Sequence, residues 1–74
     1  MNIGERIRYF RHLKGWSQEQ LALRAGLNTA FLGHLEQGLK SPTVRTLEKV
    51  AKGLEITLGE LFADDPMSRG PGDI

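Results

Sequence analysis

The chain of 74 residues contains no cysteine, which excludes disulfide bridges and thiolate metal sites. It has no apolar run near the roughly 18 residues that a membrane span requires. Its basic, amphipathic N-terminus also lacks the uninterrupted apolar core of a signal peptide. These absences predict a cytoplasmic protein. There are no internal repeats and no strand-like alternation of polar and apolar residues, which favours an all-α fold.

The sequence also has little of what catalysis requires. Its only histidines are His12 and His34, and no cysteine is present to act as a nucleophile. Nothing resembles a phosphate-binding glycine loop. His34 and Glu36 do not form a metal site, because residues two apart on a helix point in different directions. We therefore expect no enzymatic activity, no cofactor and no metal.

The small formal net charge of +1 hides an uneven distribution of charge. Residues 1–54 contain nine lysines and arginines and four glutamates, whereas residues 55–74 contain one arginine and five acidic residues. A basic body with an acidic end is consistent with a surface that binds a polyanion.

Residues 16–38 show a pattern of two short helices joined by a tight turn. Ser17 is a helix N-cap with a glutamine three residues later, which completes a capping box. Gly26 suits a left-handed helix end, and Asn28 offers a second N-cap two residues later. Gly38 then ends the second helix. The pattern predicts a helix-turn-helix unit.

Apolar residues at helical spacing predict three further helices. A first helix near residues 2–14 has the apolar stripe Ile3, Ile7, Phe10 and Leu13. Its other face carries Arg6, Arg8, His12 and Lys14. Ser41-Pro42-Thr43 opens a fourth helix, which has the apolar stripe Val44, Leu47, Val50, Ala51 and Leu54. A capping box at Thr57 and Glu60 starts a short fifth helix that includes Phe62. We expect one domain, residues 1–63, followed by a flexible tail or linker start, residues 64–74.

These features resemble the phage-repressor-like helix-turn-helix family, which includes lambda repressor, Cro and bacterial regulators of the xenobiotic-response-element type. The matching segments are Ser17–Ala22, Ala25–Leu27, Leu35–Gly38 and Ser41–Thr43, followed by Leu47 and Ala51. The resemblance spans about residues 3–62. It implies a compact five-helix lambda-repressor-like domain whose third helix, about residues 28–37, enters the major groove of double-stranded DNA. It also implies a two-fold dimer.

The exposed face of that third helix supplies the predicted base contacts, which are Thr29, Ala30, Gly33 and His34. Thr29 and Ala30 suit apolar contact with a thymine methyl group, and Thr29 can also accept a base hydrogen bond. His34 suits guanine or a phosphate, with a simply solvated histidine as the alternative. A mid-helix glycine is about 1 kcal/mol less favourable than alanine. Gly33 therefore indicates a close approach, either to the DNA groove or to another helix.

Other polar residues are predicted to contact DNA phosphates: Gln18, Gln37, Lys40, Ser41, Thr43 and Arg45. The resemblance places Gln18 at a phosphate-binding helix N-terminus, where the helix dipole assists. It also places the loop after Gly38 against the DNA backbone, with a merely solvated Lys40 as the alternative. Few residues here suit bidentate base recognition, so DNA shape is expected to contribute to specificity.

The resemblance also implies a partly buried ion pair between Arg11 and Glu36, which would hold the third helix at its docking angle. The fifth helix carries more large apolar side chains than so short a helix easily buries. We therefore expect these side chains at a dimer or partner interface: Leu58, Leu61 and Phe62. The alternative is that they close the core.

Taken with the resemblance, these residues predict a sequence-specific DNA-binding transcriptional regulator, in particular a repressor, that binds a palindromic operator as a homodimer. The expected partners are DNA, a second copy and an effector domain or protein partner. We expect it in the cytoplasm of a bacterium or in phage, associated with the nucleoid. The alternative is a protein-interaction module of the antitoxin or coactivator type. Binding to DNA should weaken steeply with salt, whereas apolar docking should hardly respond.

Overall fold

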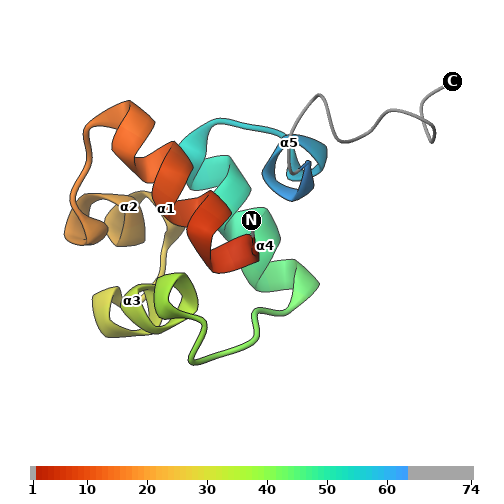
Figure 1. The fold of residues 1–74 in the computed structure, drawn as a ribbon. Coiled ribbons are helices and arrows are strands. Elements are labelled where there is room, and N and C mark those ends of the chain that lie inside the picture. The colour runs from red at the N-terminus through yellow and green to blue at the C-terminus, as the bar shows by residue number, and fades with distance from the viewer. Residues whose placement is uncertain (1, 64–74) are drawn as a thin grey trace, which may run out of the picture.

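The computed structural model describes residues 2–63, and within that range it contains five helices and no strand (Figure 1). They are α1 (Ile3–Lys14), α2 (Gln18–Ala25), α3 (Thr29–Gln37), α4 (Val44–Leu54) and α5 (Leu58–Phe62). This confirms the predicted all-α, five-helix architecture. None of these helices is long and apolar enough to cross a membrane. The predicted tail, residues 64–74, lies outside the described residues.

Each helix begins where a side chain accepts hydrogen bonds from amides of the first turn. Ser17 Oγ accepts from the Gln20 amide at 3.1 Å, and Gln20 Oε1 accepts from the Ser17 amide at 2.8 Å. Asn28 Oδ1 accepts from the amides of Ala30 and Phe31 at 2.8 and 3.2 Å. Both predicted caps are therefore confirmed, and they define where α2 and α3 begin.

The turn between α2 and α3 depends on a left-handed residue. Gly26 has a φ of 69°, and its amide donates to the carbonyls of Ala22 and Leu23. A side chain is disfavoured in this conformation, so glycine lets the chain leave α2 sharply. Only Leu27 and Asn28 then separate this cap from α3. The predicted helix-turn-helix is confirmed.

Every helix contributes to one apolar core. Its fully buried large side chains are Ile7, Leu21, Leu32, Leu35, Val50, Leu54 and Leu61. Two helices meet backbone to backbone at Gly53 of α4, where an added Cβ would lie 3.0 Å from the Ala25 nitrogen of α2. The α2–α4 pair therefore forms a close-packed support for the rest of the domain.

Three sequence predictions about the core faces are wrong. Leu13 is 64% exposed, because the buried face of α1 is turned toward Gly4, Ile7 and Arg11. Arg6, predicted to lie on the solvated face of α1, is instead buried against α5. Val44 is 63% exposed, because it lies in the first turn of α4, before the apolar core begins at Leu47.

Candidate nucleic-acid interface

The outer face of α3 is polar and open to solvent. Thr29, Ala30, His34 and Gln37 are all exposed, as the 100° spacing of helical residues predicts. Leu32 and Leu35 are buried on the opposite side, and the half-buried Phe31 packs against the core. Three of the four predicted base-contacting residues therefore lie together on an accessible surface.

Gly33 does not share that exposure, and its predicted role as a base contact needs correction. It is buried, and the side chain next to it belongs to Gln18 of α2. An added Cβ would lie 3.4 Å from Gln18 Oε1 and 3.7 Å from Gln18 Nε2. Close packing against another helix, one of the two explanations for this glycine, is therefore supported.

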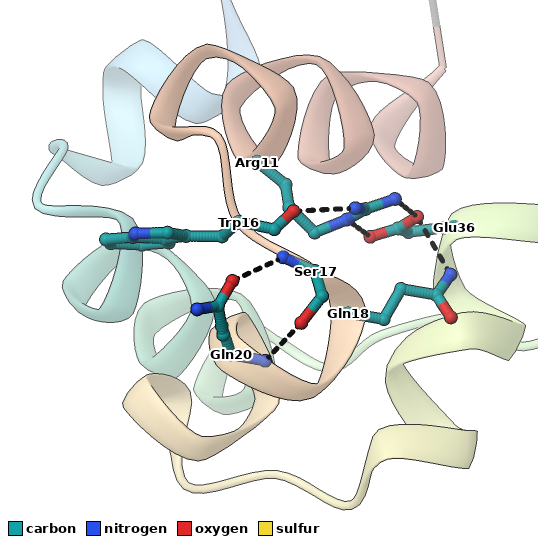
Figure 2. Close-up of polar contacts among 6 residues, drawn as sticks. All are labelled: Arg11, Trp16, Ser17, Gln18, Gln20 and Glu36. Carbon is teal, nitrogen blue, oxygen red and sulfur yellow. Dashed lines mark hydrogen bonds and ion pairs between the residues drawn. The ribbon is translucent and has the colours of Figure 1, made fainter.

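A buried ion pair joins α1 to α3. Arg11 Nε and Nη2 donate to the two carboxylate oxygens of Glu36 at 2.7 and 2.9 Å (Figure 2). The two side chains are only 10% and 2% exposed. This bidentate geometry confirms the predicted pair. Arg11 Nη1 also donates to the Trp16 carbonyl at 2.9 Å, so the same guanidinium holds the loop that leads into α2.

Gln18 extends this network from the first turn of α2. Its Nε2 donates to Glu36 Oε1 at 3.1 Å, and Figure 2 shows the side chain crossing from α2 to α3. The carboxylate of Glu36 thus accepts from residues of α1 and α2 while belonging to α3. These polar contacts fix the relative orientation of the three helices from within.

A second contact between α1 and α3 lies at Gly4, which the sequence did not predict. An added Cβ would clash with the Leu35 carbonyl oxygen and lie 2.8 Å from that of Glu36. The backbones of α1 and α3 therefore meet at the position where Gly4 has no side chain. Glycine inside a predicted helix was the available signal, because its cost indicates a close approach.

The loop after α3 places further predicted residues on the surface. Lys40, Ser41, Thr43 and Arg45 are all exposed. Thr43 is also the N-cap of α4, where its Oγ1 accepts from the Thr46 amide at 3.1 Å. Lys40 and Arg45 thus bring positive charge to the chain segment that follows the exposed face of α3, as binding to phosphates requires.

The predicted interface residues of α5 differ in exposure. Leu61 is fully buried, so its assignment to a dimer or partner surface is wrong: it closes the core. Leu58 is half-buried and packs on that core. Phe62 is 51% exposed and remains available to a partner.

Comparison with known proteins agrees with this geometry. SlrR, an HTH-type transcriptional regulator of Bacillus subtilis strain 168, is 41% identical over 66 residues, which cover 88% of this chain and 43% of SlrR. This chain thus spans less than half the length of that relative. The restriction-modification controller protein C.AhdI from Aeromonas hydrophila has a TM-score of 0.79 at 38% identity, covering 81% of this chain and 91% of that one.

SinR, the master regulator for biofilm formation, is similar to this chain in two solved complexes. Its structure with DNA has a TM-score of 0.78 at 35% identity and covers 84% of this chain and 100% of that one. The SinR–SinI complex has a TM-score of 0.80 at 30% identity and covers 96% of this chain and 70% of that one. Such relatives are regulators and not enzymes, in agreement with the prediction that this chain is no enzyme. Residues 7–61 match the helix-turn-helix family HTH_3, and the chain belongs to that family.

Proposed function

We propose that this chain is a sequence-specific DNA-binding transcriptional regulator, acting as a repressor, that docks α3 in the major groove of a palindromic operator as a homodimer. The observation that carries the proposal is the exposed face of Thr29, Ala30, His34 and Gln37, held on an internally braced helix. An α-helix fits the major groove of B-DNA. The similarity to SinR, which has been solved with DNA, supports the same use. Such a protein acts at the nucleoid, in the cytoplasm.

The proposed contacts divide into two kinds. Thr29 and Ala30 approach thymine methyl groups, and His34 donates to guanine or to a phosphate. Gln18, Gln37 and the loop residues Lys40, Ser41, Thr43 and Arg45 contact phosphates. Because this surface has few bidentate base readers, DNA shape supplies part of the specificity.

Selection of bound sequences from random DNA tests the proposal. We expect a two-fold motif whose half-sites lie about one helical turn, roughly 34 Å, apart. Affinity should fall steeply as salt rises, because bound phosphates release counterions. Failure to enrich any sequence would overturn sequence-specific binding, and a motif without two-fold symmetry would overturn the dimer.

Point variants separate base from phosphate contacts. His34→Ala should change the preferred bases, whereas Gln18→Ala should weaken binding about equally on all sequences. Lys40→Ala should lower affinity and reduce the salt slope by about one unit for each subunit, which is about two units for the dimer. Lys52→Ala, which removes the same charge from the exposed last turn of α4, is the matched control and should change neither.

A protein-interaction module is the second candidate, and one observation favours it. Phe62 is 51% exposed at the end of the domain, although aromatic side chains gain from burial. SinR, which is similar, has also been solved in a complex with SinI. In this case Phe62→Ala should abolish partner binding at all salt concentrations and leave DNA affinity per dimer unchanged.

A further inference from the structure

The side chain of Gln18 lies directly against Gly33, next to the point where a Cβ would stand. Its Oε1, Nε2 and Cδ atoms would lie 3.4, 3.7 and 3.8 Å from a Cβ added to Gly33. All three atoms of the carboxamide are thus at van der Waals distance from one point on α3. On the helical wheel Gly33 lies between Thr29 and Gln37. An amide from α2 therefore borders the exposed face of α3.

The orientation of this amide is set by charge. Glu36 is buried and accepts two hydrogen bonds from Arg11 and a third from Gln18 Nε2, at 3.1 Å. A flipped amide would place Oε1 against the carboxylate and replace attraction with repulsion. One Nε2 hydrogen is therefore committed to Glu36. The second hydrogen of the same nitrogen is left as a donor.

We propose that Gly33 is a positioning residue: its lack of a side chain seats the Gln18 carboxamide across α3, where Glu36 locks it with one N–H free to donate to a DNA phosphate. The proposal rests on the proposed function, since it concerns the same surface. It explains the absence of a large side chain at position 33 without a direct contact between Gly33 and DNA. It also gives Glu36 a role in addition to its pairing with Arg11.

The distances predict which substitutions this arrangement tolerates. An alanine Cβ at position 33 would make ordinary contact with Oε1 at 3.4 Å, so the amide can stay in place. The γ-methyl groups of valine extend beyond Cβ into the space occupied by the amide, so Gly33→Val must displace Gln18. Gly33→Leu is a second displacing variant, in which the substituted residue is a better helix former.

A double-mutant cycle on operator DNA tests the proposal. Counted for each subunit of the proposed dimer, Gln18→Ala and Gly33→Val should each weaken binding about tenfold, the loss expected for one hydrogen bond to a charged acceptor. Gly33→Ala, the matched control, should bind like the parent chain. If Gly33 acts through Gln18, the double variant Gln18→Ala/Gly33→Val should also lose about tenfold. A loss near a hundredfold would overturn the proposal, because Gly33 would then act on DNA independently.

The free protein provides a second readout that does not depend on DNA. The side-chain amide protons of Gln18, assigned by their absence in Gln18→Ala, should resonate away from the positions of a solvated glutamine in an NMR spectrum. Gly33→Ala should preserve these resonances, and Gly33→Val or Gly33→Leu should move them to the positions of a solvated glutamine. Unchanged resonances in a folded displacing variant would overturn the proposal. A parent chain that shows the locked amide but binds no DNA would overturn the proposed function and the phosphate contact, and would leave the seating of Gln18 by Gly33 and Glu36 standing.

Discussion

Two buried arginines of α1 hold two different helices by different means. Arg11 pairs with the carboxylate of Glu36 on α3, and Arg6 donates to the Glu60 and Leu61 carbonyls of α5 at 2.8 and 3.3 Å. The Arg6 guanidinium also lies 5.0 Å from the ring centroid of Phe10, within the range of a cation–π contact. Arg11 is thus matched to a side-chain charge of α3, and Arg6 reaches the main chain of α5.

The two contacts differ in what remains when the arginine is removed. Removing Arg11 leaves a buried anion on α3, so this joint is sensitive to any change in either partner. Removing Arg6 takes its donors away from two neutral carbonyl groups of a short helix. The orientation of α3, which carries the proposed DNA surface, therefore depends on a joint between two buried charges.

Arg11→Met should have the largest effect, because it leaves Glu36 buried without its cation. Losses of about 3–5 kcal/mol in unfolding free energy are typical of a broken buried pair. Urea unfolding followed by the fluorescence of the single tryptophan, Trp16, measures this. The double variant Arg11→Met/Glu36→Leu should recover part of the loss, because no charge remains buried. If the double variant is as unstable as the single one, the buried anion is not the cause.

Gly4→Ala should be the next most damaging change. The added methyl group would clash with the carbonyl oxygens of Leu35 and Glu36, which belong to a helix backbone and have little room to move. Overpacking of this kind costs about 2–3 kcal/mol. The folded fraction should also bind DNA less tightly, because α3 must shift. Gly59→Ala is the control: among the described residues its Cβ would meet only Thr57 Oγ1, at 3.8 Å, so stability should hold or rise.

The sequence predicted the helix ends well because their signals are local. Each cap, such as the Ser17–Gln20 box or the left-handed Gly26, involves residues within four positions of one another. The Arg11–Glu36 pair spans 25 positions and was predicted only through the family resemblance. Periodicity alone does not reveal such a distant partner.

Exposure and main-chain contacts were less predictable, because both depend on the packing of distant elements. Leu61 was assigned to an interface, but the core of this small domain has room for it. Gly33 was placed on the DNA face, where the side chain of Gln18 covers it. The partners of Gly4 and Arg6 include carbonyl oxygens, which every residue carries, so no residue type in the sequence marks those contacts.

Arg6→Met tests the contact between α1 and α5. It keeps most of the apolar stem and removes the donors to the Glu60 and Leu61 carbonyls, and the loss of these two hydrogen bonds should cost about 1–2 kcal/mol of unfolding free energy. Hydrogen exchange should speed up mainly at the amides of α5. The DNA affinity of the folded variant should stay near that of the parent chain. A loss equal to that of Arg11→Met would show that the two joints do not differ as described.

Glu55→Gly should change the unfolding free energy least, and it should raise stability where the other variants lower it. Glu55 ends α4 with a φ of 62°, and it is the only non-glycine residue among residues 2–63 with a positive φ. Glycine removes the Cβ strain of that conformation, a gain of about 1 kcal/mol. The exposed Lys14–Glu55 pair, at 3.3 Å, would be lost, but such pairs contribute only about 0.3 kcal/mol. Thermal unfolding should therefore shift upward by a few degrees. Gly15→Ala, at a φ of 72° on the C-cap of α1, should shift it downward, and a common sign for the two variants would contradict this explanation.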